Sequence, residues 1–145
     1  MMSADALKLR QDLRRDEGVR LKPYRCSMGK LTIGVGRLLD DAGGISSNEA
    51  TILLDNDIAR VEHGLDEYHP WWRSLPEPAA RALINMAFQL GLGGLAKFKQ
   101  TLAQLRAGDY TAAAEEALDS AWAKQTPERA KRVTDLFRSA GEHHG

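Results

Sequence analysis

The chain has 145 residues, 43% of them hydrophobic and 28% charged, which is the composition of a globular protein and excludes a disordered chain. One cysteine and four scattered histidines argue against a disulfide and a zinc site, and no apolar run approaches the roughly 18 residues of a membrane span. The net charge is zero, with residues 1–37 basic, 38–70 acidic and 71–145 weakly basic, so a protein that binds nucleic acid is not expected.

The first part of the chain predicts a helix followed by a small sheet. Leucines at helical intervals among charged residues predict a helix over residues 6–16. Between Leu21 and Leu39, glycines and a proline interrupt short runs of strand-forming residues. This pattern predicts an antiparallel sheet with a turn near Ser27–Gly29, followed by a loop over residues 40–44.

A long helix is predicted next. Ser46 and Glu49 have the spacing of a capping box, and the apolar residues that follow suit one face of a helix over residues 46–67. We expect this helix to link two halves of the molecule. Trp71 and Trp72 follow at a bend, where packing is the preferred interpretation and stacking on a sugar is the alternative.

The remainder predicts a helical bundle. Residues 79–90 are apolar nearly all round, as in a central helix, and their polar side chains recur every four residues on one face: Arg81, Asn85 and Gln89. Further helices are predicted over residues 95–106, 109–123 and 127–140, with Asp109 and Thr126 as caps.

These elements predict an α+β fold in a single domain spanning residues 1–145. A small N-terminal antiparallel sheet lobe over residues 17–45 is expected to carry the active site. The connecting helix over residues 46–67 then leads to a C-terminal helical lobe over residues 71–140, on which helix 6–16 packs.

Three residues at fixed spacing carry the chemistry: Glu17, Cys26 and Thr32. Each alone has an ordinary structural explanation, namely a solvated acid, a small buried group and a strand former. The segments around these residues closely resemble the phage-type lysozymes, the endolysin family of the T-even phages. The matching segments are residues 16–24 (Asp-Glu-Gly-Val-Arg-Leu-Lys-Pro-Tyr) and 29–39 (Gly-Lys-Leu-Thr-Ile-Gly-Val-Gly-Arg-Leu-Leu). In that family a glutamate is followed by Asp or Cys and then Thr at these spacings. Residues 82–91 and 122–133 extend the resemblance, which covers most of residues 7–138 and implies a lysozyme-like fold.

The resemblance implies a role for each catalytic residue. Glu17 is the implied general acid, which protonates the leaving oxygen of a glycosidic bond, and Arg129 matches the position that pairs with this glutamate. Cys26 replaces the aspartate of the best-known members. Either Cys26 and Thr32 place a water for inversion, or Cys26 attacks the sugar and a covalent intermediate forms. We favour the first route because the hydroxyl of Thr32 is suited to positioning water.

Four further positions carry over from the family. Gln89 matches a substrate-contacting position, whereas Asn85 is expected to be structural. Arg37 stands where the T-even enzyme has a histidine, and Asp57 aligns with that histidine's acidic partner. We therefore expect an Arg37–Asp57 ion pair that ties the sheet to the long helix.

The resemblance implies a muramidase, an endolysin that hydrolyses the β-1,4 bond between N-acetylmuramic acid and N-acetylglucosamine in peptidoglycan and lyses the host. No metal or cofactor is expected, and the enzyme is expected to be a monomer without stable membrane insertion. The charged N-terminus does not resemble a signal peptide, so the enzyme is expected in the host cytoplasm until a holin opens the way to the periplasm and wall. The alternatives are a lytic transglycosylase acting on the same bond, a non-catalytic peptidoglycan-binding relic, and a lytic domain carried by a phage tail.

Overall fold

The computed structural model describes residues 4–40 and 43–144, with side chains from 6–40 and 43–142. The chain divides into two compact units, residues 1–52 and residues 53–145, and the boundary falls inside helix α2 (Ser47–Tyr68). Residues 41–42 of the expected loop lie outside the described residues. None of the helices in the described ranges combines the length and apolar character needed to cross a membrane.

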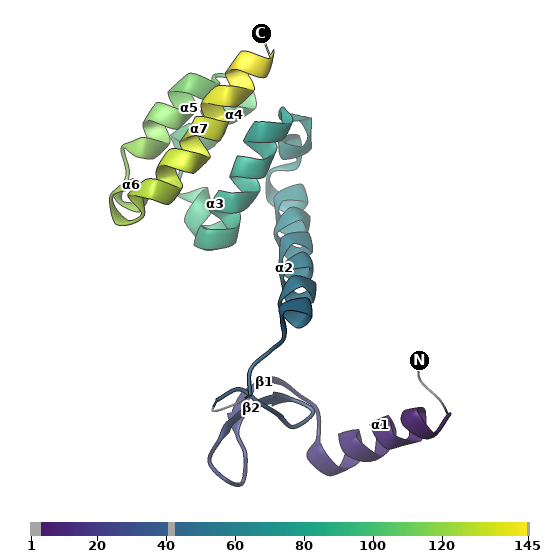
Figure 1. The fold of residues 1–145 in the computed structure, drawn as a ribbon. Helices are drawn as coiled ribbons and strands as arrows, with labels where there is room; N and C mark the ends of the chain where they lie inside the picture. The colour runs from purple at the N-terminus through teal and green to yellow at the C-terminus, as the bar shows by residue number, and fades with distance from the viewer. Residues whose placement is uncertain (1–3, 41–42, 145) are drawn as a thin grey trace. The chain divides into compact units, whose positions relative to one another are not determined.

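The first unit contains helix α1 and a three-stranded antiparallel sheet (Figure 1). Helix α1 spans Ala4–Glu17 and ends at Gly18, whose positive φ of 77° suits the residue after a helix and whose N–H donates to the carbonyl of Arg14 at 2.9 Å. The strands lie in the order β1 (Arg20–Arg25), β2 (Leu31–Gly34) and β3 (Arg37–Leu38). The predicted α+β class, with its sheet at the N-terminal end, is confirmed.

Helix α2 begins with the predicted capping box. The hydroxyl of Ser46 accepts the N–H of Glu49 at 3.1 Å, and the carboxylate of Glu49 accepts the N–H of Ser46 at 2.9 Å. The helix ends at Tyr68, and the expected bend is a short 3₁₀ helix, η1 (Pro70–Ser74). The capping box therefore sets the N-terminal end of α2.

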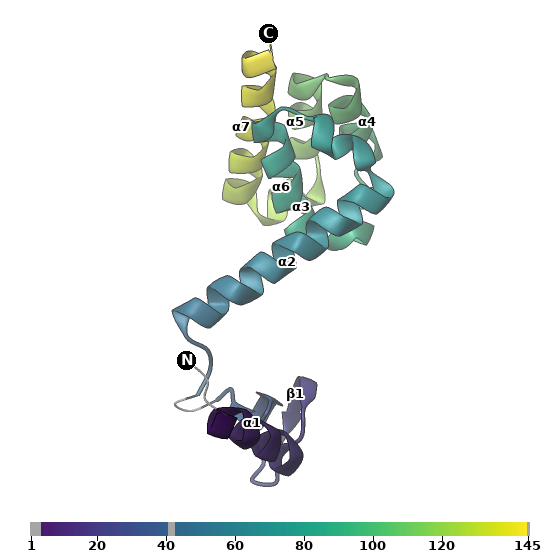
Figure 2. The same cartoon turned by 90° about the vertical axis from the view of Figure 1, so that its right-hand side faces the viewer.

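The second unit is a helical bundle built around α3 and α7. Its helices are α3 (Glu77–Ala96), α4 (Lys99–Ala107), α5 (Tyr110–Leu118), α6 (Ala121–Gln125) and α7 (Pro127–His144). Helix α7, yellow in Figures 1 and 2, packs along α3 and α5. The fully buried side chains of Leu83 and Met86 on α3 and Phe137 on α7 belong to its core. The prediction that residues 79–90 form a central helix is confirmed.

The structure corrects several helix ends. The expected helix over 109–123 is two helices, because Asp119 leaves the helical conformation with ψ at 62° and the hydroxyl of Ser120 begins α6 by accepting the N–H of Ala123 at 3.2 Å. Gly91 interrupts α3 with φ at 74°, as predicted, but helical residues resume and run to Ala96.

The hydrogen bonding of the two predicted helix caps also differs from the expectation. Asp109 stands at the N-cap of α5, but its side chain makes no capping hydrogen bond. The hydroxyl of Thr126 donates to the carbonyl of Trp122 at 3.0 Å, back into the preceding helix α6. Helix α7 extends past the expected end at residue 140 to His144.

Candidate functional site

The hairpin between β1 and β2 brings Cys26 and Thr32 together. Thr32 lies opposite Tyr24 in the strand register, and Cys26 follows Tyr24 by two residues, so alternation places the two side chains on the same face. The N–H of Cys26 donates to the carbonyl of Lys30 at 2.9 Å, and the N–H of Gly29 donates to the carbonyl of Cys26 at 2.8 Å, which closes the turn. The spacing of these residues in sequence is therefore a consequence of a tight hairpin.

The thiol of Cys26 is surrounded by hydrogen-bond donors. Backbone hydrogen bonds from Lys30 and then Met28 stabilise the thiolate and lower the pKa of Cys26 from its ordinary value. Thr32 is only 1% exposed, and its hydroxyl donates to the carbonyl of Lys30 at 2.8 Å. Because that donation uses its single proton, the oxygen of Thr32 is left as an acceptor.

Glu17 is the last residue of α1 and is exposed in the structure. Its carboxyl lies against Gly36 in the turn between β2 and β3, because a Cβ added at Gly36 would stand 2.9 Å from Oε2 of Glu17. The same hairpin carries Thr32, which pairs with Leu38 two residues beyond that turn glycine. The carboxyl of Glu17, at the end of α1, thus lies against a turn of the sheet that carries Thr32.

The structure gives Arg37 a different partner from the one predicted. Its guanidinium donates to both carboxylate oxygens of Glu49, at 3.0 and 2.8 Å, and to the carbonyl of Gly44 at 2.9 Å. Asp57 instead pairs with Arg60 on its own helix. The reason is position along α2, since Asp57 follows Glu49 by eight residues, about 12 Å along the axis.

The Arg37–Glu49 pair closes the first turn of α2. Hydrogen bonding from Arg37, followed by the backbone N–H of Ser46, lowers the pKa of Glu49 to about 2. Glu49 therefore caps the helix and holds β3 through the same carboxylate. The predicted Arg37–Asp57 tie is replaced by this one.

The polar face predicted on α3 binds neighbouring helices. Arg129 on α7 donates through Nε to the side-chain oxygen of Asn85 at 2.9 Å, and the indole N–H of Trp122 on α6 donates to Gln89 at 2.9 Å. Arg81 pairs with Glu77 within α3. Asn85 thus orients Arg129, and Gln89 orients Trp122.

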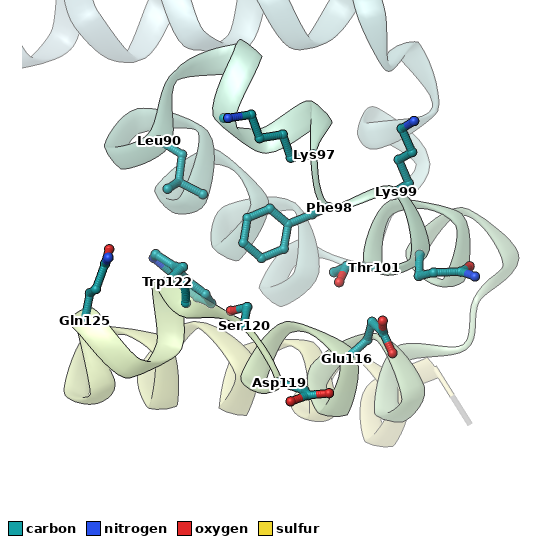
Figure 3. Close-up of a pocket in the computed structure, with 13 residues that line it drawn as sticks. Leu90, Lys97, Phe98, Lys99, Thr101, Glu116, Asp119, Ser120, Trp122 and Gln125 are labelled. Carbon is teal, nitrogen blue, oxygen red and sulfur yellow. The ribbon is translucent and has the colours of Figure 1, made fainter.

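A pocket of about 510 Å³ opens beside Trp122 in the helical unit (Figure 3). Phe98 meets the ring of Trp122 edge to face, with 5.9 Å between the ring centres. Thr101, which is 2% exposed, also lines this pocket, and among the described residues its hydroxyl has no hydrogen-bond partner. The pocket therefore combines aromatic walls with an unused polar group.

Charged side chains of both signs line the same pocket. Lys97 and Lys99 lie on one side of it in Figure 3, and Glu116 and Asp119 lie on the other. These residues are not predictable from the sequence, because they come from separate segments and no local pattern joins them. Across the part of the chain that the structure describes, no three His, Cys, Asp or Glu side chains gather as a metal site would require.

Comparison with known proteins shows that this chain is similar to phage lysozymes and to several individual proteins. The phage lysozyme family matches residues 14–139. The chain is 35% identical to the pre-baseplate central spike protein Gp5 of Enterobacteria phage T4, an alignment that covers 90% of this chain and 28% of that protein. It is 28% identical to probable T4-type lysozyme 2 of Dictyostelium discoideum, over 90% of this chain and 94% of that protein. It is also 30% identical to an endolysin of Acyrthosiphon pisum secondary endosymbiont phage 1, over 77% of this chain and 75% of that protein.

Proposed function

The chain belongs to the phage lysozyme family, and on that basis we propose that it hydrolyses peptidoglycan at the β-1,4 bond between N-acetylmuramic acid and N-acetylglucosamine. The observation that carries the proposal is the arrangement on the small sheet. Cys26 and Thr32 share one face of a hairpin, and the turn of the adjoining hairpin lies against the carboxyl of Glu17. Glycoside hydrolysis requires an acid and a water-directing group, and here they come from the end of α1 and from the adjoining sheet.

In the proposed reaction, each of the three residues has a separate task. Glu17 donates its proton to the oxygen of the departing sugar as the glycosidic bond breaks. A water attacks the anomeric carbon while it donates a hydrogen bond to the oxygen of Thr32, and it passes one proton to the thiolate of Cys26 and keeps the other as the new sugar hydroxyl. Exchange with solvent then returns a proton to Glu17 and removes the proton from Cys26. This route inverts the configuration at the anomeric carbon.

One observation favours a second route on the same residues. The hydrogen bonds that lower the pKa of Cys26 also raise the fraction of thiolate, which is a good nucleophile. In this route the sulfur attacks the anomeric carbon, Glu17 protonates the leaving oxygen, and water later releases the sugar from the sulfur. Mass spectrometry of protein quenched during turnover separates the routes, because only this one adds a sugar to Cys26.

Two substitutions test the assignment of roles. Glu17→Gln removes the proton donor and should lower the rate by about 10²–10⁴-fold, the usual contribution of general acid catalysis. Cys26→Ser keeps a polar group that can hold water, and should retain a sizeable fraction of the activity. The assay is the clearing of Gram-negative cells with a permeabilised outer membrane. Equal activity of Glu17→Gln and wild type, or binding to walls without clearing, would contradict the proposal.

Product analysis distinguishes hydrolysis from transglycosylation. A hydrolase releases muropeptides with reducing ends, whereas a lytic transglycosylase releases the anhydro sugar. We expect reducing ends only, because the acceptor oxygen of Thr32 and the thiol of Cys26 form a site for water. Anhydro products from the wild-type protein would refute the water-based route.

The lining of the pocket beside Trp122 favours a substrate whose glycan strands carry peptides. Peptidoglycan carries peptides on its glycan strands, and aromatic walls with charges of both signs suit such a substrate. Gln89 orients Trp122 at this pocket and is proposed to act in substrate binding through that ring.

The biological setting that we propose is lysis of the host by an enzyme that reaches the wall after a holin has permeabilised the membrane. The match to a phage spike protein favours a second setting, in which such a domain acts on the wall as part of a virion. Mass spectrometry of purified virions decides between them. We expect the chain in the lysate and absent from particles, and stoichiometric recovery with particles would support the second setting.

A further inference from the structure

A second pocket of the helical unit lies between η1 and α4. It has a volume of about 370 Å³ and is lined by the following residues: His69, Trp71, Leu102, Ala103, Arg106 and Ala107. We call it the Trp71 pocket. It shares no lining residue with the pocket beside Trp122, to which α4 contributes Lys99, Gln100 and Thr101.

Trp71 differs from the other two tryptophans in its hydrogen bonding. Trp72 is 4% exposed and its indole N–H donates to Asp66 at 2.8 Å, whereas Trp122 is 5% exposed and donates to Gln89. Trp71 is only half-buried, and within the described part of the chain its indole N–H makes no hydrogen bond. Since tryptophan N–H groups usually find a partner, this donor is available to a ligand.

The polar side chains around the ring are equally available. The imidazole of His69 meets Trp71 edge to face, with 5.8 Å between the ring centres. Burial lowers the pKa of His69, so at neutral pH the ring is uncharged and offers one donor and one acceptor. Arg106 is exposed in the last turn of α4, and within residues 4–40 and 43–144 it forms no ion pair.

Small residues keep the pocket open. Ala103 and Ala107 stand one turn apart on α4 and both line the pocket with Trp71, so no long side chain from these two positions fills the pocket. Leu102, which is 8% exposed, supplies an apolar contact surface. The lining of the site thus includes an aromatic ring, an apolar side chain, and polar groups from Trp71, His69 and Arg106.

We propose that the Trp71 pocket is a second glycan-binding site, which takes an N-acetylhexosamine unit of the wall polymer. A pyranose ring has an apolar C–H face that packs on an indole. Its hydroxyl and acetamido groups match the donors of Trp71 and Arg106 and the donor and acceptor of His69.

This inference rests on the proposed function, because the polymer bound is the one that the enzyme cleaves. A second attachment to the same long polymer raises the local concentration of substrate and slows release from the wall. The site is therefore expected to matter for insoluble walls and not for short soluble fragments.

The test uses the full chain carrying Glu17→Gln, labelled with ¹⁵N, and the soluble tetramer of β-1,4-linked N-acetylglucosamine as the probe. The three indole N–H signals report separately on Trp71, Trp72 and Trp122. We expect the Trp71 signal to move on titration. Ala103→Arg fills the pocket from α4 without altering the ring, and should weaken that binding by about tenfold, the loss of one stacked ring and its hydrogen bonds. Ala59→Arg, an exposed change of the same charge on α2, should leave it unchanged.

A second measurement uses otherwise wild-type protein. Ala103→Arg should slow the clearing of insoluble walls while leaving hydrolysis of short soluble muropeptides unchanged. A stationary Trp71 signal, equal effects of Ala103→Arg and Ala59→Arg, or loss of soluble-fragment hydrolysis would overturn the second site. Failure of the wild-type protein to hydrolyse any substrate would instead overturn the proposed function, and the titration would still report whether the pocket binds glycan.

Discussion

Replacement of Gly36 by alanine tests whether the β2–β3 turn sets the position of Glu17, the proposed general acid. A Cβ at this position would lie 2.9 Å from Oε2, 3.1 Å from Cδ and 3.3 Å from Cγ of Glu17. Carbon and oxygen atoms at van der Waals contact are separated by roughly 3.4 Å or more, so the carboxyl must move by about half an ångström. Because a misplacement of about 1 Å can cost 100-fold in rate, we expect kcat to fall by roughly tenfold.

Gly34 provides a matched control at the other end of the same turn. Gly34 and Gly36 have φ of +71° and +68°, so alanine at either position costs a similar 1–2 kcal/mol or so of backbone strain. A Cβ at Gly34, however, meets nothing within 4 Å. Both variants should therefore melt at similarly lowered temperatures, and only Gly36→Ala should show the additional loss of rate.

The assay compares the clearing of permeabilised cells with thermal unfolding for the two variants. It is carried out well below both melting temperatures, so that the folded fraction is the same. Equal rates for Gly34→Ala and Gly36→Ala, or a wild-type kcat for Gly36→Ala, would show that the turn does not position Glu17.

Two further predictions concern stability. The pKa of Glu49, lowered to about 2 mainly by Arg37, means that this carboxylate stabilises the fold above its ordinary pKa and loses that contribution as the pH falls toward 2. The melting temperature between pH 5 and pH 2 should therefore fall less steeply for Glu49→Gln than for wild type, and parallel curves would refute the linkage. In urea unfolding, Gly64→Ala should lose about 1–3 kcal/mol, because the added Cβ overlaps Cδ1 and crowds Cγ of Leu92. Gly93→Ala, a helical position with open space, should gain about 0.5–1 kcal/mol, and the opposite order would contradict the packing.

Features set by a few neighbouring residues were predictable from the sequence. The capping box at Ser46 and Glu49, the end of α1 near Gly18 and the hairpin that carries Cys26 and Thr32 all depend on local hydrogen bonds and on the period of side chains along a helix or strand. The apolar character of residues 79–90 likewise predicted their place in the core. Local hydrogen bonds and side-chain periodicity are the same wherever a segment lies in the fold, so they can be predicted from its sequence.

Features that depend on a choice among distant partners were decided by the tertiary structure. Arg37 has several carboxylates of suitable chemistry along α2, and only the position of β3 selects Glu49 over Asp57. The two adjacent tryptophans are equivalent in sequence, yet Trp72 is buried with a bonded N–H and Trp71 lines an open pocket. Hydrogen bonds and burial act over a few ångströms, so pairing between remote segments is defined only once packing has brought them together.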